Sequence, residues 1–301
     1  MRKLLSSSHF YAFTTVLLWS SAYVLTKVAL VHFSVAALGF LRCLTASAVL
    51  SLLLIFTKRS PVRLRELPWL AASGAAGFAL YLMVFNLGSG LLNPTTSCVI
   101  ISTAPIITAL IARFIFQEHL TASGWAATLT AFGGVVLLMS GGGGMMAGQG
   151  VFWMLLASLL ISIYNIIQRR LTVSRSPLEI TTYSFILGTV MLIWCLPEAF
   201  NEMINAPARY SAVVVFLGLF PSALAYLAWA EALSLAVNTG SVANYMYLTP
   251  FLALILEYLV LGEGPGKETF IGGGVILASL FIFARLGRSP NRAKHPRDDD
   301  V

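Results

Sequence analysis

NPTTSCVIISTAPIITALIARFIFQE (residues 93–118) and NTGSVANYMYLTPFLALILEYLVLGE (residues 238–263) are the two stretches that decide the fold. Placed one above the other, they align at Asn93/Asn238, Pro105/Pro250 and Glu118/Glu263, a shift of 145 positions. The same shift aligns Tyr81 with Tyr226 upstream, without a gap. Four matched positions in two apolar segments indicate a duplicated chain, and transporters are often built from internal repeats with the substrate held between them.

The composition is that of a membrane protein. Hydrophobic residues make up 58% of the chain, charged residues 10%, and the mean hydropathy is +0.84. Apolar runs of about 20 residues are long enough to cross the bilayer as helices. We count ten of them: 10–30, 35–56, 68–91, 94–116, 122–140, 150–168, 179–197, 210–235, 239–261 and 268–286. The first run contains Lys27 and lacks a small-residue cleavage site, so it is interpreted as a retained helix rather than a signal peptide.

Positive charge predicts the orientation. With the ten runs alternating in direction, one side of the membrane receives nearly all lysines and arginines, and the other side receives only Arg209 and Lys267, while Lys27 and Arg42 lie within runs. The positive-inside rule then places both termini in the cytoplasm, and the protein is expected as a multi-pass protein of the bacterial inner (plasma) membrane. Five runs per half is an odd number, so the two halves must enter from opposite sides. The expected fold class is therefore all-α and polytopic, with ten transmembrane helices as two inverted five-helix repeats.

The expected domain organisation follows. Residues 1–140 form the first repeat, residues 141–149 a glycine-rich linker, residues 150–286 the second repeat and residues 287–301 a cytoplasmic tail. The glycine run lacks the Lys-Ser/Thr and the strand–helix context of a phosphate-binding loop. The basic tail is interpreted as a topology anchor next to the lipid bilayer rather than as a nucleic-acid-binding segment.

The segment LWSSAYVLTK (Leu18–Lys27) resembles the first-helix signature of EamA-type members of the drug/metabolite transporter superfamily. The paired segments Asn93–Glu118 and Asn238–Glu263 resemble the fourth and ninth helices of that family. The resemblance covers the chain apart from about its last fifteen residues. It implies a ten-helix carrier with a central cavity that opens alternately to the two sides. It does not fix the substrate, since members carry amino acids, nucleotide sugars, phosphorylated compounds or drugs.

Pro105 and Pro250 are predicted hinge residues, because a proline removes a backbone donor and kinks a helix. A kink that only shapes packing is the alternative. Glu118 and Glu263 end the same helices and are interpreted as structural residues near the first amides of the next helix. The small-residue patches 73–77, 133–134 and 272–274 should permit close helix approach, within the molecule or in a homodimer.

Aromatic and amide side chains form the predicted substrate site. They suit amphipathic solutes, because an aromatic ring buries a large area and tyrosine and tryptophan add one hydrogen-bonding group. The alternative for each ring is the interfacial aromatic belt, which explains Trp69, Trp125, Trp153 and Tyr210 at the ends of runs. The predicted substrate-binding residues are Trp19, Ser20, Tyr23, Lys27, Tyr81, Asn86, Asn165, Tyr226, Trp229, Asn244, Tyr245 and Tyr247, and Tyr164 is considered with them.

Charged residues in the runs are few. Lys27 either attracts an anionic substrate group or extends to the interface, and Arg42 is interpreted mainly as tying down carbonyls at a helix end. The first run has no carboxylate, so transport is not expected to depend on a titrating acid there; Glu231 and Glu257 are the other candidates. Cys43, Cys98 and Cys195 are interpreted as core residues, and no metal, cofactor or catalytic group is expected.

The predicted function is secondary transport of small amphipathic metabolites, such as amino acids or related compounds, by alternating access and in the export direction. A nucleotide-sugar or organic-phosphate exchanger ranks lower, because it would need several cations in the cavity. A lipid-modifying membrane enzyme is the alternative from another class. It lacks support, because no G-x-S-x-G motif or zinc motif is present. A channel would need rings of like side chains.

Overall fold

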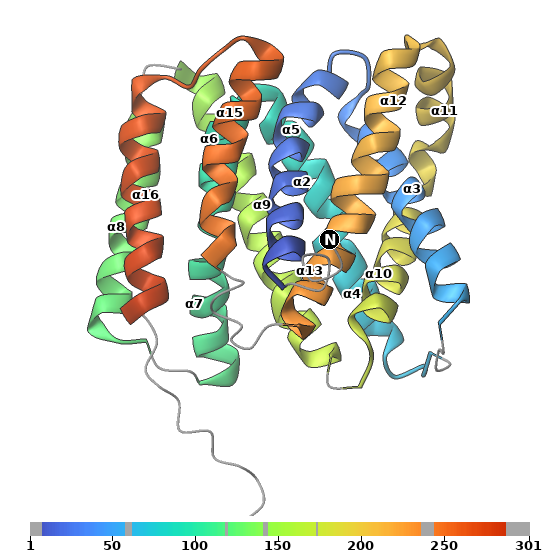
Figure 1. Cartoon of the computed structure of the whole chain (residues 1–301), viewed down its shortest axis with the longest axis horizontal. Coiled ribbons are helices and arrows are strands. Elements are labelled where there is room, and N and C mark those ends of the chain that lie inside the picture. Colours follow the sequence, from blue (N-terminus) through green and yellow to red (C-terminus); the bar gives the residue numbers. More distant parts are fainter. Residues whose placement is uncertain are drawn as a thin grey trace, which may run out of the picture.

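The computed structural model describes residues 8–57, 62–117, 120–140, 144–172, 174–235 and 244–286. The regular elements in these ranges are helices (Figure 1). They are α2 (Ser8–Ala29), α3 (Val35–Ile55), α4 (Leu67–Gly74), η1 (Ala75–Ala79), α5 (Leu80–Leu91), α6 (Pro94–Ile101), α7 (Ala104–Phe116), α8 (Ala122–Ser140), α9 (Gly144–Leu171), α10 (Pro177–Met191), η2 (Ile193–Cys195), α11 (Leu196–Asn205), α12 (Ala208–Leu217), η3 (Gly218–Leu224), α13 (Ala225–Ser234), η4 (Asn244–Leu248), α15 (Thr249–Leu261) and α16 (Lys267–Leu286). The predicted all-α fold is confirmed.

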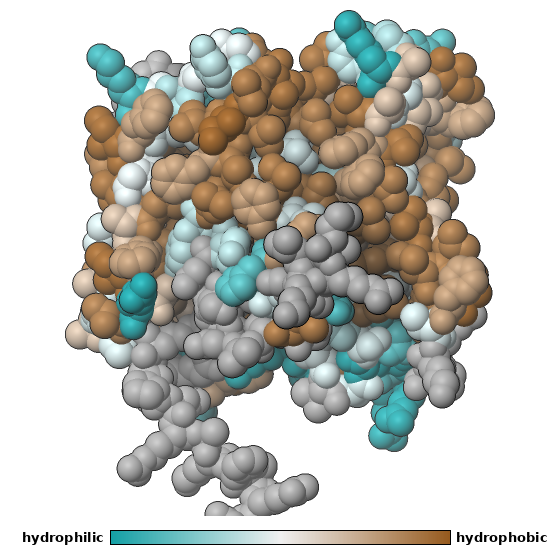
Figure 2. Space-filling model, viewed as in Figure 1, coloured by the Kyte–Doolittle hydropathy of each residue, from teal (hydrophilic) through white to brown (hydrophobic). Residues whose placement is uncertain are grey.

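Helices long and apolar enough to cross a membrane make up most of the molecule. Seven pass that test in the described ranges, and the bent pair α10 with η2 and α11 is an eighth. Two shorter apolar helices, Ala122–Leu138 and Tyr245–Leu261, fill the remaining expected runs. Helices suit this environment because every backbone polar group is satisfied within the segment. Figure 2 shows the result as a broad hydrophobic belt with hydrophilic residues toward its two edges. The chain is a polytopic membrane protein.

Two boundaries differ from the sequence-based prediction. The seventh run ends in a 55° bend between Pro177–Met191 and Ile193–Asn205, and α11 then forms a separate helix. Pro197 lies in the first turn of α11, where its missing amide hydrogen costs no helical hydrogen bond. The sixth helix begins at Gly144, six residues before the predicted start at 150, so part of the glycine-rich linker is helical.

The two halves repeat the same irregularities 145 positions apart. The third span is interrupted by the π-helical segment η1, and the eighth span by the π-helical segment η3. η3 starts two residues before the position that corresponds to the start of η1. The fourth span breaks between α6 and α7, and the ninth changes from the 3-10 helix η4 to α15. Pro105 and Pro250 each occupy the first turn of the helix after these breaks. The prolines therefore start helical segments, and their role as hinges stays a prediction.

Left-handed backbone also recurs at equivalent positions. Gln117 (φ 54°) ends α7 and Gly262 (φ 70°) ends α15, and these are the positive-φ residues of the described ranges. A left-handed residue at this place is a common way to terminate a helix. Glycine adopts this conformation without strain, whereas the glutamine does not have that freedom.

The packing of the helices follows an inverted two-fold pattern. α5 packs on α9 in the same way as its equivalent α13 packs on α2, the equivalent of α9. Likewise, α7 packs on α9 as its equivalent α15 packs on α2. The pairs α3 with α10 and α8 with α16 each join a helix to its own equivalent. In Figure 1, α8 and α16 lie together at one edge of the molecule and α3 lies toward the other edge. The core of the bundle is therefore shared between residues of both halves.

All three predicted small-residue patches lie at contacts between the two halves. A Cβ atom on Gly134 of α8 would lie 2.9 Å from the carbonyl oxygen of Gly272 on α16, and a Cβ on Gly272 would lie 2.8 Å from that of Gly134. A Cβ on Gly74 would lie 2.6 Å from the carbonyl oxygen of Ser184 on α10. Close backbone approach between membrane helices requires small residues at the contact. These glycines pack helices within the molecule.

An ion pair joins the two halves at the end of the bundle where α3 ends and α4 begins. The Arg175 guanidinium donates to Glu66 Oε2 from Nη2 (2.6 Å) and Nε (2.9 Å), and Nη1 approaches Glu179 Oε1 at 3.4 Å. Hydrogen bonds from Arg175 and from the Arg63 amide lower the pKa of the Glu66 carboxyl. The arrangement ties the loop before α4 to the loop before α10.

The depressed pKa of Glu66 predicts a pH dependence of stability. Its stabilising contribution is complete above the pKa of the unfolded chain and is lost as the pH falls through the lower, folded-state pKa. The melting temperature of the detergent-solubilised protein should therefore fall as the pH is lowered below the ordinary pKa of glutamate. Glu66→Gln should flatten that drop and Glu268→Gln, at an exposed glutamate, should not. Identical acid-side curves for wild type and Glu66→Gln would refute the assignment.

Candidate functional site

Six aromatic rings from both halves meet in the interior. We call them the seam cluster: Trp19 of α2, Phe78 of η1, Tyr164 of α9, Phe185 of α10, and Tyr226 and Trp229 of α13. The ring of Tyr226 lies at its centre, with ring centroids at 5.6 Å from Trp19, 5.7 Å from Phe78, 6.1 Å from Phe185 and 6.4 Å from Tyr164. These contacts are edge-to-face, the arrangement that aromatic pairs favour. Trp229 adds a contact of 5.5 Å to Trp19.

A second ring group continues from the seam cluster. The ring of Phe85 lies 5.4 Å from Tyr23 and 5.6 Å from Tyr81, and the Arg42 guanidinium carbon is 6.0 Å from the same ring. Tyr81 packs against both large hydrophobic clusters of the interior, the one that contains Phe78 and the one that contains Phe85. Tyr81 thus links this second ring group, which Arg42 faces, to the hydrophobic cluster that contains Phe78.

Helical spacing explains the ring positions of the third span. Phe78, Tyr81 and Phe85 are three and four residues apart, so they share one face of the helix. Gly77 lets the Tyr164 ring approach, since a Cβ at this position would lie 2.2 Å from a ring carbon of Tyr164. Phe78, Phe85 and Phe185 are not among the residues predicted from the sequence. The spacing on either side of Tyr81 would have identified the first two.

Two predicted polar residues donate hydrogen bonds to backbone carbonyls close to helix ends. Ser20 Oγ donates to the carbonyl oxygens of Val16 (2.6 Å) and Thr249 (3.1 Å), and so joins α2 to α15. Lys27 Nζ donates to the carbonyl oxygens of Gly90 (3.0 Å) and Leu92 (3.1 Å). Its ammonium therefore satisfies the end of α5, as cations near helix C-termini commonly do.

Asn86 is fully buried and has an unsatisfied atom. Its Nδ2 donates to the carbonyl oxygen of Val35 at 3.1 Å, whereas its Oδ1 has no partner among the described residues. A Cβ on Gly39 of α3 would lie 3.7 Å from that Nδ2, so Asn86 lies against α3 one turn from Arg42. A buried amide oxygen without a donor is available to a ligand.

The other predicted residues lie apart from the seam cluster. Asn165 is exposed on α9, although its neighbour Tyr164 is buried. The Tyr245 hydroxyl lies 3.2 Å from His9 Nδ1, and the Tyr247 hydroxyl donates to the carbonyl oxygen of Leu280 at 3.2 Å. The side chain of Asn244 lies outside the described part of the chain.

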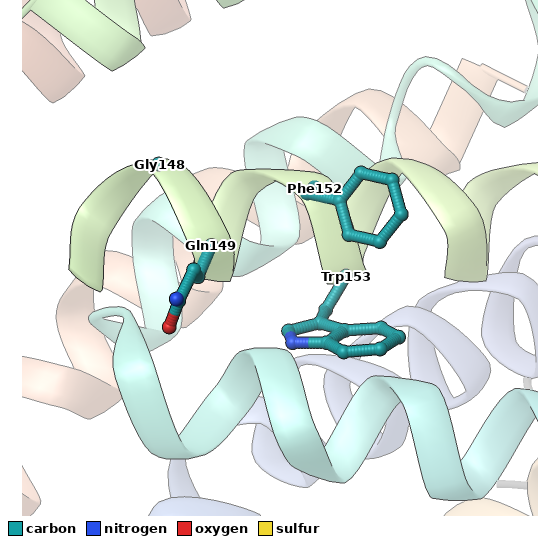
Figure 3. A pocket seen from close by; sticks show the side chains of 4 residues that line it. All are labelled: Gly148, Gln149, Phe152 and Trp153. Atoms are coloured by element: carbon teal, nitrogen blue, oxygen red, sulfur yellow. The ribbon is translucent and has the colours of Figure 1, made fainter. Parts of the chain in front are cut away.

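Two surface depressions in the described part of the chain are lined by residues outside the seam cluster. One is lined by Gly148, Gln149, Phe152 and Trp153 of α9 alone, and Figure 3 shows the Trp153 ring between that helix and a neighbouring helix. The other is lined by Tyr247, Phe251, Leu277 and Phe281. The seam cluster itself is filled by rings in mutual contact.

A buried carboxylate joins the halves at the opposite end of the bundle from Glu66. Glu257 of α15 is fully buried, and its Oε2 accepts hydrogen bonds from the Thr95 amide (2.9 Å) and the Thr95 hydroxyl (2.5 Å) at the start of α6. The Thr96 and Thr269 hydroxyls, 2.7 Å apart, join α6 to α16 nearby. Contacts between halves thus close the seam at both ends.

Comparison with known proteins agrees with this architecture. The fold and the two related halves are those of a membrane transporter. The EamA-like transporter family model matches residues 6–140 and again residues 148–285, and the chain belongs to this family, within the drug/metabolite transporter superfamily. A solved crystal structure shares the fold at a TM-score of 0.63 and 18% identity, over 96% of this chain and 98% of that one.

Three relatives illustrate the similarity. A protein of Streptantibioticus cattleyicolor named "Probable terminal-alkyne amino-acid exporter" is 30% identical, over 91% of this chain and 93% of that protein. The transporter YdfC of Bacillus subtilis is 29% identical, over 90% of this chain and 89% of that protein. A protein of Rickettsia bellii named "S-adenosylmethionine uptake transporter" is 28% identical, over 62% of this chain and 63% of that protein. These similarities establish transport as the general function.

Proposed function

We propose that this protein is a secondary carrier that exports small amphipathic metabolites, amino acids or related compounds, across the inner (plasma) membrane by alternating access. The observation that supports it most directly is the seam cluster. Its rings come from α2 and η1 of the first half and from α9, α10 and α13 of the second, so any relative movement of the halves rearranges it. Such a cluster suits a solute with an apolar body.

Contacts between the halves define the states that a carrier would exchange. The Glu66–Arg175 pair closes one end and the Glu257–Thr95 hydrogen bonds close the other. Opening either end alone would expose the seam cluster to one side of the membrane. We propose that the helix breaks at Pro105 and Pro250 are the hinges, and that both termini face the cytoplasm, as the distribution of arginines predicts.

The names of the relatives favour amino-acid-like solutes. A terminal-alkyne amino acid and S-adenosylmethionine both carry an amino-acid group. The two names differ in direction, one export and one uptake, and the export direction follows the relative that matches over 91% of this chain. The alternative of a nucleotide-sugar or organic-phosphate exchanger is weaker, because Arg42 is the one arginine or lysine of the described residues that contacts the ring groups inside the bundle.

A ligand screen tests the proposal. The purified protein would be melted with amino acids, nucleosides, sugar phosphates and cationic drugs, since a ligand that binds only the folded state raises the melting temperature. We expect stabilisation by large apolar amino acids. Tyr226→Ala should abolish that ligand-induced shift, because Tyr226 is the centre of the seam cluster.

Tyr258→Ala is the matched control, since Tyr258 is an exposed tyrosine of α15. The ligand-induced change in melting temperature is measured within each variant. A change in the stability of the ligand-free variant therefore does not affect the comparison. A full ligand shift in Tyr226→Ala would show that the seam cluster is not the binding site. Stabilisation by sugar phosphates alone would favour the exchanger.

A further inference from the structure

Arg42 is a buried cation in the middle of a membrane helix. It lies near the centre of α3 and only 5% of its surface is exposed. Its side chain reaches into the bundle, where Nη1 lies 3.3 Å from the Thr26 hydroxyl of α2 and Nη2 lies 3.4 Å from the Ser222 hydroxyl of η3. Both are long for charged hydrogen bonds, which are usually nearer 2.8 Å.

The positive charge of Arg42 has no counter-charge within the part of the chain that the structure describes. Among the described residues, no carboxylate lies within ion-pair distance of its guanidinium, and residues 1–65 contain no aspartate or glutamate. Its Nε atom is buried without any hydrogen-bond partner. By contrast, Arg175 has two carboxylates and Lys27 has two carbonyl oxygens. An unpaired charge inside a membrane is costly and marks a functional site.

The surroundings of Arg42 join it to the proposed solute site. Its guanidinium faces the Phe85 ring, which contacts Tyr23 and Tyr81, and Tyr81 also packs against the hydrophobic cluster that contains Phe78. Its partner Ser222 lies in η3, the π-helical segment of the eighth span, and donates to the carbonyl oxygen of Leu217 five residues earlier. π-helical segments are frequent at functional sites. Both halves of the chain therefore hold the cation at one end of an aromatic surface.

We propose that Arg42 binds the carboxylate of the transported solute, so that the carrier selects amphipathic monocarboxylates, such as amino acids, over their neutral derivatives. The inference rests on the proposed function and names its substrate class. A guanidinium offers several N–H donors in a planar fork that matches the two oxygens of a carboxylate. The rings of Phe85, Tyr23 and Tyr81 beside it would receive the apolar side chain. One cation matches one carboxylate, whereas a phosphate dianion would leave a buried negative charge uncompensated.

Matched ligand pairs test the proposal in the wild-type protein. The full chain would be titrated with L-phenylalanine and phenylalaninamide, and with L-leucine and leucinamide, at a mildly acidic pH where all four amines are protonated. Each pair differs in the carboxylate alone. We expect the acids to stabilise the protein and the amides to bind about 10-fold more weakly or worse, the difference expected for a charged hydrogen bond.

Variants assign the selectivity to one residue. Arg42→Met keeps an apolar side chain of similar length and should remove the preference for acids, so that acid and amide bind alike, while Arg42→Lys should retain part of it. Lys27→Met is the matched control and should keep the full preference, because Lys27 binds backbone carbonyls. If Arg42→Met does not fold, Arg42→Lys decides: a preference for acids as strong as that of the wild-type protein would overturn the assignment to Arg42.

The outcomes separate the two proposals. Equal binding of acids and amides by wild type would overturn the role of Arg42 and leave the amphipathic carrier intact. A preference for acids that survives Arg42→Met would also overturn it. If neither member of any pair stabilises the wild-type protein, the inference and the proposed substrate class fail together.

Discussion

Leucine in place of Gly134 is expected to destabilise the protein strongly, by about 1–3 kcal/mol or more, the usual cost of overpacking a close contact. Even a Cβ at this position would lie 2.7 Å from Ile276 Cγ1 and 2.9 Å from the carbonyl oxygen of Gly272. The carbonyl cannot move aside without shifting α16, so α8 and α16 must separate. Melting of the solubilised protein measures the effect.

Gly133 is the matched control, because it is the adjacent residue of the same helix and a Cβ there would meet nothing within 4 Å. The melting temperature of Gly133→Leu should equal that of the wild-type protein or lie slightly above it. Glycine destabilises a helix by about 1 kcal/mol relative to good helix formers. Equal destabilisation by the two substitutions would show that the α8–α16 contact is not as described.

Leucine in place of Glu257 is expected to have the second large effect. Glu257 is fully buried, and its Oε2 accepts hydrogen bonds from the Thr95 amide and hydroxyl. Without it, two buried donors lose their acceptor, at roughly 1–3 kcal/mol for each group left unsatisfied. Glu257→Gln retains an acceptor oxygen and should cost less. The melting temperatures of both variants, in detergent, measure the difference.

The contact with Thr95 can be isolated with a double-mutant cycle. Thr95→Val removes the hydroxyl donor, so the effects of Glu257→Leu and Thr95→Val should be non-additive if the hydrogen bond joins them. Tyr258→Leu, at the exposed neighbour of Glu257, is the control and should change little. Additive effects would mean that Glu257 stabilises the protein through other contacts.

The sequence predicted the fold because membrane helices are determined by simple quantities. Run length and hydropathy predicted the apolar helices, and the pairs Tyr81/Tyr226 and Pro105/Pro250 predicted the duplication. The bend before α11 was missed, because a helix of ten residues is too short to be recognised by the length of an apolar run. The π-helical segments were missed as well, since they depend on tertiary packing around η1 and η3 rather than on local preference.

The candidate site was only partly predictable. Chemistry selected Trp19, Tyr226 and Trp229, which the structure brings together. It could not tell which face of α9 is inside, so it selected the exposed Asn165 along with the buried Tyr164. For the cations, sequence position favoured Lys27 over Arg42 as a candidate. In the folded chain, Lys27 donates to two backbone carbonyls and Arg42 lacks a counter-charge among the described residues, so the structure favours Arg42 as the candidate.

Cysteine accessibility in intact cells tests the inverted repeat most directly. Thr57, after the second span, and Asn205, after the seventh span and α11, are exposed at nearly equivalent places in the two halves. The native cysteines at 43, 98 and 195 are buried and would be replaced. We predict that a membrane-impermeant maleimide labels Asn205→Cys from outside and Thr57→Cys only after permeabilisation. Labelling of both from the same side would contradict the inverted architecture and the carrier mechanism built on it.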